Sequence, residues 1–212
     1  MRFQVIPVTP FEQNCSLVWC EATGSAALVD PGGDVDLLLA EVEKAGVRLD
    51  KLLLTHAHID HVAGTPALAR RLGLPVYGPG KADAFWLDAL PEQSRMFGFP
   101  ACEAFRPDHW LQDGDTVELG ELRFQVIHCP GHTPGHVVFY EPASRHAFVG
   151  DVLFQGSIGR TDFPRGDHRA LIHAIREKLF PLGDEVAFVP GHGPMSTFGR
   201  ERRSNPYVGD RA

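Results

Sequence analysis

Three histidines and one aspartate lie within six residues of this chain, at His56, His58, Asp60 and His61. They come directly after the apolar run 51–54. Neutral imidazole nitrogens and carboxylate oxygens are ligands that zinc, iron and manganese accept. If a strand runs into a tight loop here, His56 and His58 point to the same side, because side chains alternate along a strand. Asp60 and His61 then lie on the turn, so one short segment could ligate two ions.

Three more ligand-type residues occur downstream, and each follows a strand-like apolar run that ends in a turn with glycine or proline. They are His132, Asp151 and His192. Catalytic sites are commonly built from loops that a rigid sheet holds in place. Each motif alone is weak evidence, but four of them, each at a strand end, predict one metal centre.

With these motifs the chain resembles the metallo-β-lactamase superfamily, and within it the short glyoxalase II-type hydrolases (hydroxyacylglutathione hydrolases). The resemblance runs from the segment Leu-Val-Asp-Pro-Gly at 28–32 to Pro-Gly-His-Gly-Pro at 190–194. The segment Gly-Ser-Ile-Gly-Arg-Thr-Asp-Phe at 156–163 resembles one found both in glyoxalase II-like enzymes and in persulfide dioxygenases.

The resemblance implies two divalent metal ions per chain, with zinc favoured and iron or manganese also accepted by such ligands. The ligands that it implies for metal 1 are His56, His58 and His132. Those for metal 2 are Asp60, His61 and His192, and Asp151 bridges the two ions. Asp60 is also the implied catalytic residue, because it can orient a hydroxide. Arg160 is the candidate substrate-binding residue, although a plain surface arginine is nearly as good an interpretation.

The periodicity of the sequence predicts a mixture of helices and strands. Helices are expected at 34–45, 65–72 and 167–179, and strands at 3–8, 15–20, 26–30, 52–55, 75–77, 116–119, 123–127, 137–140, 146–149 and 185–189. The segment 81–107 is the least periodic, and its aromatic residues could cover the site or pack in the core. The α/β architecture itself, an αββα four-layer sandwich of two mixed sheets with helices outside, is implied by the resemblance.

Length and charge limit the function classes. With 212 residues, a net charge of −7 and a pI of about 5.8, we expect a single catalytic domain over 1–212 and no nucleic-acid partner, because phosphate binding needs clustered basic residues. The basic cluster at 200–203 fits a solvated helix face. No signal core and no run of ~20 apolar residues occur, so we expect no membrane partner and a cytoplasmic location. The oligomeric state stays open, and a monomer is compatible with the sequence.

Other polar residues near the motifs are expected to have structural or supporting roles. His136 ends the motif Gly-His-Thr-Pro-Gly-His and is expected to pack against the ligands or orient them rather than bind metal. Asp30 is expected to hydrogen-bond the metal loop. Cys129 fits a buried structural thiol, and the four cysteines show no pairing pattern.

Three functions fit these expectations. The first is a dinuclear hydrolase of a glutathione thioester such as S-D-lactoylglutathione. The second is a mononuclear-iron persulfide dioxygenase, and the third is a metal-binding module without catalysis. Long-form glyoxalase II has a helical C-terminal domain that contacts glutathione, whereas only 195–212 follow the last motif here, so we expect no separate glutathione-binding domain and weak substrate affinity.

Overall fold

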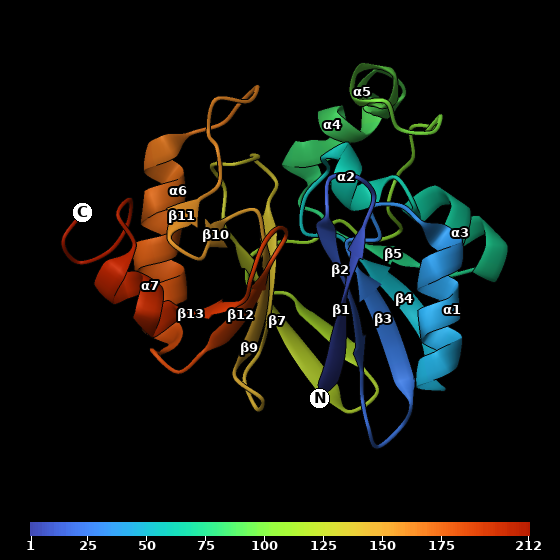
Figure 1. Cartoon of the computed structure of the whole chain (residues 1–212), viewed down its shortest axis with the longest axis horizontal. Helices are drawn as coiled ribbons and strands as arrows, with labels where there is room; N and C mark the ends of the chain where they lie inside the picture. Colours follow the sequence, from blue (N-terminus) through green and yellow to red (C-terminus); the bar gives the residue numbers. More distant parts are fainter.

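The computed structural model describes residues 1–212 and contains two mixed β-sheets that lie face to face (Figure 1). The first sheet has the strand order β1-β2-β3-β4-β5, with bounds Arg2–Val8, Gln13–Trp19, Ser25–Val29, Arg48–Leu53 and Val76–Tyr77. Its first three strands are antiparallel neighbours, whereas β3, β4 and β5 are parallel.

The second sheet has six strands in the order β13-β12-β9-β8-β7-β6. Their bounds are Thr116–Leu119 (β6), Leu122–His128 (β7), Val137–Glu141 (β8), His146–Gly150 (β9), Ala187–Pro190 (β12) and Ser196–Thr197 (β13). Only β9 and β12 are parallel neighbours. A small hairpin of β10 (Leu153–Phe154) and β11 (Ser157–Ile158) stands beside the sheet.

Helices cover the outer face of each sheet (Figure 1). On the first sheet these are α1 (Val35–Ala45) and α3 (Thr65–Leu72), and on the second they are α6 (His168–Ala174) and α7 (Phe198–Ser204). The other helices are α2 (Ile59–Val62), η1 (Lys81–Asp83), α4 (Ala84–Asp88), α5 (Leu90–Phe97), η2 (Ile175–Leu179) and η3 (Phe180–Leu182). The αββα four-layer sandwich implied by the sequence is confirmed.

Three apolar clusters fill the three spaces between these layers. The central strands are buried on both faces, so consecutive residues belong to different clusters. In β4, Leu52 packs toward the helices, whereas Leu53 packs between the two sheets. In β8, Val138 packs toward α6 and α7, and Phe139 packs between the sheets. Burial on both faces explains why these strands are continuous apolar runs in the sequence.

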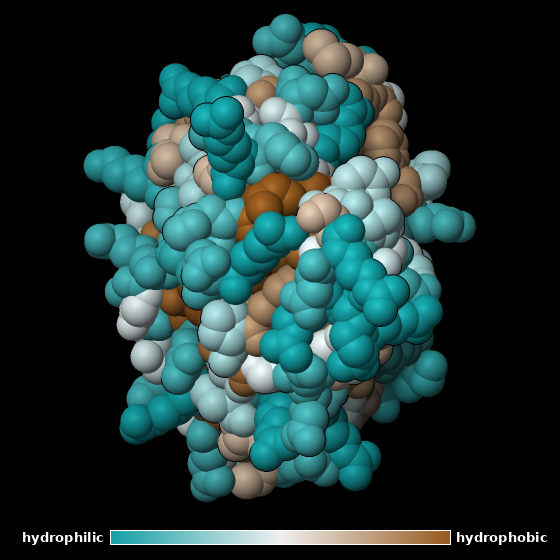
Figure 2. Space-filling view, turned by 90° about the vertical axis from the view of Figure 1, so that its left-hand side faces the viewer, coloured by the Kyte–Doolittle hydropathy of each residue, from teal (hydrophilic) through white to brown (hydrophobic).

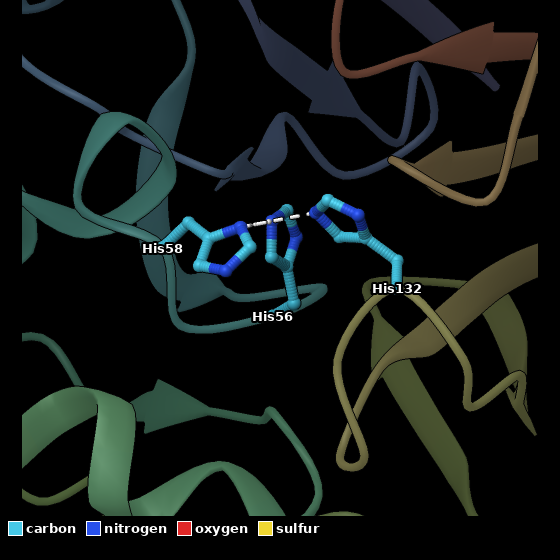
Figure 3. Close-up of side chains that lie close together, drawn as sticks. All are labelled: His56, His58 and His132. Atoms are coloured by element: carbon cyan, nitrogen blue, oxygen red, sulfur yellow. Dashed lines mark hydrogen bonds between the residues drawn. The ribbon is translucent and has the colours of Figure 1, made fainter. Parts of the chain in front are cut away.

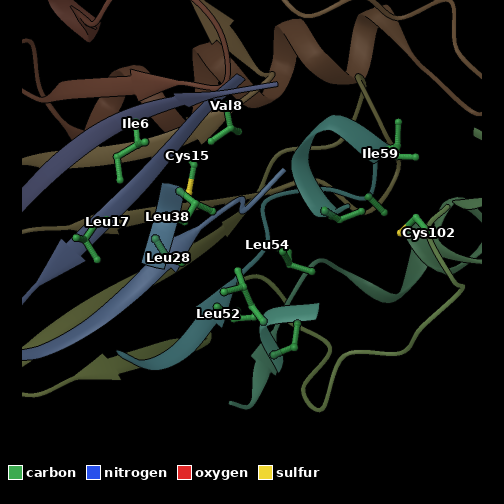
Figure 4. Packing of buried hydrophobic residues seen from close by; sticks show 14 of the residues in the cluster. Ile6, Val8, Cys15, Leu17, Leu28, Leu38, Leu52, Leu54, Ile59 and Cys102 are labelled. Carbon is green, nitrogen blue, oxygen red and sulfur yellow. The ribbon is translucent and has the colours of Figure 1, made fainter. Parts of the chain in front are cut away.

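The cluster under α1 illustrates how the outer layers are held (Figure 4). Leu17, Leu28 and Leu52 reach it from three strands of the first sheet, and Leu38 reaches it from the helix. All four side chains are completely buried. Burying a leucine side chain stabilises a fold by roughly 1.5–3 kcal/mol, so this interface anchors the strand that leads into the first metal motif.

Strand β4 ends at Leu53, two residues before the end expected from the sequence. The backbone N–H of Thr55 donates to Asp30 Oδ1 at 2.7 Å instead of continuing the strand ladder. The predicted helix 65–72 is present with these bounds, and Gly64 is its N-cap. The Gly64 N–H donates to the carbonyl of Pro31 at 2.9 Å, which ties the start of the helix to the loop after β3.

The predicted helix 167–179 is α-helical only as far as Ala174 and continues as a π-helical turn, η2. Asp167 is its N-cap, and its side chain accepts from Ala170 N at 3.0 Å. The elements α2, α4, β10, β11 and β13 were not predicted, because with two to five residues none is long enough to show a period. The helix α5 was not predicted either, because it lies in the least periodic segment, 81–107.

No helix in the structure is both long and apolar enough to cross a membrane. Figure 2 shows the face on the side of α6 and α7, where hydrophilic side chains predominate and apolar ones appear only in small patches. Arg200, Arg202 and Arg203 lie on α7, and Arg202 and Arg203 pair with Asp184 at 2.8 and 3.3 Å. The expected solvated helix face therefore includes ion pairs within the chain.

Candidate metal centre

The loop after β4 carries four of the predicted ligands. His56 and His58 lie in the loop itself, and α2 begins directly after His58, whose backbone is extended. The single turn of α2 carries Asp60 and His61. His56, His58 and His61 are buried, whereas the Asp60 side chain is 16% exposed. The four side chains therefore line the inner wall of one site, with a carboxylate open to solvent.

The other three predicted ligands lie past the ends of β7, β9 and β12. Since β7 and β9 are both antiparallel to β8, and β12 is parallel to β9, these strand ends meet at one edge of the second sheet. His132, Asp151 and His192 are carried there. A backbone bond from Val137 N to Thr55 O, 2.8 Å long, joins this edge to the first loop. The structure thus brings all seven predicted residues together.

The first group of ligand atoms consists of three imidazole nitrogens (Figure 3). His58 Nδ1 lies 3.2 Å from His56 Nε2 and 3.0 Å from His132 Nε2. His58 Nδ1 carries at most one proton, so it cannot donate a hydrogen bond to both of these nitrogens. A zinc ion about 2.0–2.1 Å from each nitrogen in tetrahedral geometry needs nitrogens roughly 3.3 Å apart, so the spacing fits a metal ion.

The second group is Asp60, His61 and His192, whose ligand atoms lie within 4.8 Å of one another. Asp60 Oδ2 is 3.1 Å from His192 Nε2 and 3.8 Å from His61 Nε2. Asp151 faces both groups. Its Oδ1 is 3.4 Å from His61 Nε2, and its Oδ2 is 3.5 Å from His132 Nε2. This is the position that a bridging carboxylate requires.

Two atoms at the meeting point of the groups are buried and have no hydrogen-bond partner, His61 Nε2 and Asp151 Oδ1. An unsatisfied buried polar atom costs roughly 1–3 kcal/mol, so native structures rarely leave two of them facing each other. A cation between them would satisfy both. The residues present therefore fit a metal ion at each group.

The charges of the site lead to the same conclusion. Burial lowers the pKa of His58 to about 3 and that of His56 well below its ordinary value, so both rings are neutral, the state in which imidazole can bind a metal ion. Burial opposes ionisation of Asp151, but the charge of the nearby His61 lowers the pKa of this carboxyl well below its usual range. Burial also opposes protonation of His61, yet Asp151 and Asp60 raise its pKa well above the ordinary value. The carboxylates of Asp60 and Asp151 are therefore stabilised by a neighbouring positive charge, which either a proton on His61 or a metal ion can supply.

Hydrogen bonds at Nδ1 fix which nitrogen three of the histidine rings present to the centre. Asp30 Oδ2 accepts from His61 Nδ1 at 2.9 Å and from Thr55 Oγ1 at 2.6 Å, and Thr55 Oγ1 lies 3.1 Å from His56 Nδ1. His132 Nδ1 donates to the carbonyl of Arg160 at 2.8 Å. With Nδ1 engaged, His56, His61 and His132 offer Nε2 to the centre, whereas His58 faces it with Nδ1. The expected hydrogen bond of Asp30 to the metal loop is confirmed, and both of its oxygens are occupied by donors.

His136 is completely buried beside the ligands. Its ring stacks on His56 with centroids 4.7 Å apart, and its Nε2 accepts from the backbone N–H of Asp151 at 3.1 Å. The prediction that it packs against the ligands is confirmed. Cys129 is a free, buried thiol as expected.

Aromatic side chains shield the first group. Trp86 and Phe163 lie against the ring of His58, with centroids 4.6 and 4.7 Å away. Trp86 belongs to the aperiodic segment, so one of its aromatic residues does cover the site, whereas Phe99 and Phe105 pack against the core under the first sheet. The side chain of Arg160 is exposed, lies over Phe163, and is bonded by two nitrogens to Asp162 at 2.9 and 2.8 Å.

Three residues that support the centre were missed by the sequence reasoning. The carbonyl of Phe11 accepts from His192 Nδ1 at 3.2 Å, and Gln13 Nε2 lies 3.4 Å from His61 Nδ1. Asp83 is buried beside both ligand loops of the first group. A backbone carbonyl leaves no trace in residue type, and a single acidic residue in an aperiodic segment looks like any surface aspartate.

Comparison with known proteins places this geometry in a family. Hydroxyacylglutathione hydrolase GloC of Haemophilus influenzae is 46% identical over 213 aligned residues that span 100% of both chains. The crystal structure of BLEG-1 B3 metallo-beta-lactamase superposes with a TM-score of 0.90 at 37% identity, covering 98% of this chain and 99% of that one. TTHA1623 in a di-iron-bound form gives 0.88 at 37% identity, covering 97% and 100%. The family model described as the metallo-beta-lactamase superfamily matches residues 8–192, and the chain therefore belongs to that superfamily.

Proposed function

We propose that this chain hydrolyses glutathione thioesters, with S-D-lactoylglutathione as substrate and D-lactate and glutathione as products. The observation that carries the proposal is the pair of ligand groups that share Asp151, each suited to one divalent ion. The full-length relative named as a hydroxyacylglutathione hydrolase supports the substrate class, and the di-iron-bound neighbour supports two ions. Zinc is the proposed metal, and the same ligands accept iron or manganese.

Two divalent ions, when bound, supply a hydroxide at neutral pH and polarise the carbonyl oxygen of the thioester. Asp60 is placed to orient the attacking water, because its carboxylate is held by His192 and keeps an exposed edge. His192 in turn is fixed by the carbonyl of Phe11. The chain thus holds the oxygen nucleophile in one direction before the substrate arrives.

The oxygen of water adds to the carbonyl carbon, and the carbon–sulfur bond then breaks. The leaving thiol has a pKa of about 8.5, by analogy with cysteine, so the sulfur departs as a thiolate and takes a proton from solvent. The attacking water loses both of its protons: one balances the proton taken up by the thiolate and the other is released, so the products are a carboxylate and a thiol. No dedicated general acid is needed.

Recognition of the substrate is proposed for the rim beside the first group. Trp86 and Phe163 form an apolar wall against His58, which keeps water away from that side. Arg160 is the proposed anchor for a carboxylate of glutathione. In the structure its guanidinium is held by Asp162, so a substrate carboxylate has to replace that partner.

The test is to incubate metal-loaded protein with S-D-lactoylglutathione and to follow thiol release and oxygen uptake together. We expect one thiol per thioester, no oxygen uptake and nearly two metal ions per chain by elemental analysis. Oxygen uptake with glutathione persulfide, without thioester cleavage and with one iron per chain, would instead identify a dioxygenase. Cleavage of a β-lactam but not of the thioester would also refute the proposal, and an Asp60→Asn variant controls for contaminating hydrolases.

A further inference from the structure

Asp83 is a completely buried carboxylate at the end of η1, outside the predicted ligand set. It lies between two loops of different sheets. One is the loop after β4 that carries His56 and His58, and the other is the loop between β7 and β8 that carries His132. The three residues of the first ligand group come from these two loops.

Each oxygen of Asp83 is engaged by these loops. Its Oδ2 accepts from Ala57 N at 3.1 Å, and Ala57 is the residue between His56 and His58. The same oxygen accepts from Thr133 Oγ1 at 2.8 Å, and Thr133 directly follows His132. Its Oδ1 accepts from Gly135 N at 2.6 Å.

The segment that carries Asp83 is itself fixed on the second loop. The Gly80 N–H donates to the carbonyl of Gly135 at 2.8 Å. A Cβ on Gly135 would collide with Gly80 O and would lie 2.6 Å from Asp83 N, so only glycine permits this approach. The carboxylate is therefore built into the contact between the loops.

We propose that Asp83 is a positioning residue that sets the spacing of the three imidazole nitrogens of the first group, and with it the affinity of that group for metal. The inference rests on the metal assignment in the proposed function. Asp83 makes no hydrogen bond to Asp60, His61 or His192, and the rings of the second group are held by other residues, His61 by Asp30 and His192 by the carbonyl of Phe11. Its effect is therefore selective for one of the two ions.

The charge of Asp83 argues against a role in stability alone. Burial raises the pKa of Asp83 to about 6, although the donors from Thr133, Gly135 and Ala57 oppose the shift. At neutral pH the fold therefore holds an ionised carboxylate that is costly to bury. A residue that served only global stability would gain from losing that charge.

The experiment is chelator competition on zinc-loaded protein at pH 7.5, with the two dissociation constants resolved. His132→Ala and His192→Ala, which each remove one ligand, assign the constants to the first and second groups. We expect Asp83→Asn to raise the first dissociation constant about ten- to hundredfold, a range taken from the loss of groups that hydrogen-bond a metal ligand directly, and to change the second by less than about threefold. Asp88→Asn, an exposed aspartate of the next helix paired with Arg106, is the matched control and should change neither.

Thr133→Val removes only one of the three hydrogen bonds and should raise the first dissociation constant by a smaller factor. This variant keeps the test informative if Asp83→Asn fails to fold. Unchanged constants in both variants would overturn the proposal. Equal weakening of both constants with a lower Tm of the metal-free protein would also overturn it, because a merely structural role has that signature. Failure of the wild type to cleave the thioester would refute the proposed function but leave these constants measurable.

Discussion

The imidazole rings of the centre differ in what their nitrogens contact. His132 donates from Nδ1 to a backbone carbonyl and presents Nε2 to the ligand group, whereas His136 uses its Nε2 to accept from the backbone of Asp151. The two residues are four positions apart in one motif, and from the sequence a ligand role is expected only for His132. Their different contacts agree with that expectation.

This difference predicts different kinetic effects. His132→Ala should lower kcat/KM for the thioester by more than about a hundredfold and release one metal ion, because a ligand is lost. His136→Ala should retain both ions and lose only about tenfold, the lower end of the cost of an outer partner. Steady-state kinetics and elemental analysis of both variants check this. Equal losses in the two would show that His136 is itself a ligand.

Arg160 and Asp162 form an exposed ion pair at the rim. If Arg160 anchors a carboxylate of the substrate, Arg160→Ala should raise KM about tenfold with little change in kcat, because a remote anchor contributes equally to ground and transition states. Asp162→Asn should lower KM two- to fivefold, since exposed pairs are weak and the variant frees the guanidinium. Arg165→Ala, which removes an arginine that lies over Phe85, is the control. Unchanged KM in both variants would make the pair a bystander.

At the scale of elements, the turn after β12 is shaped around the centre. A Cβ on Gly191 would collide with Asp151 Oδ1 and lie 2.5 Å from His61 Cε1, atoms of the bridging carboxylate and a ligand ring. Gly191→Ala should therefore displace Asp151 and reduce the metal content below two ions per chain. In Gly33→Ala the added methyl meets only the side chain of Thr9, and this variant should keep both ions. Elemental analysis after desalting measures the difference, and full metal content in Gly191→Ala would contradict the bridging role.

Some of the elements and site residues could be predicted from the sequence, and others could not. The long strands and α1 were found because burial leaves a period or an apolar run in the sequence, and Gly46 ends α1 in the left-handed conformation. The helices α4 and α5 were missed, since both lie in the segment 81–107, where the apolar residues show the least regular spacing. Ligand-type residues were found because their types are rare and follow strands. Asp83 was missed because it acts on backbone atoms, which any sequence supplies.

For the whole molecule, the ligand groups join the two halves of the sandwich. The first loop extends from the first sheet, and His132, Asp151 and His192 extend from the second. A bound ion should therefore stabilise the packing of the sheets. At ion concentrations about 1,000 times Kd, binding adds about 4 kcal/mol, which for a chain of this size raises Tm by roughly 8–16 °C. Chelation followed by thermal unfolding should show this loss, with a smaller loss in His132→Ala, and an unchanged Tm would contradict metal binding across the sheets.

Burial of Asp83 makes the stability of the whole chain depend on pH in a direction opposite to that of most carboxyls. Its pKa rises from about 3.9 in the unfolded chain to about 6 in the fold. Between these values the folded chain binds a proton that the unfolded chain does not, so stability falls as pH rises, by up to about 3 kcal/mol. In metal-free protein, the free energy of unfolding of the wild type minus that of Asp83→Asn should therefore decrease by about 2–3 kcal/mol from pH 4 to pH 6.5. Urea unfolding of both chains across this range measures the difference, and groups common to both cancel. A difference that stays constant or grows with pH would show that the three donors, rather than burial, determine the ionisation of Asp83.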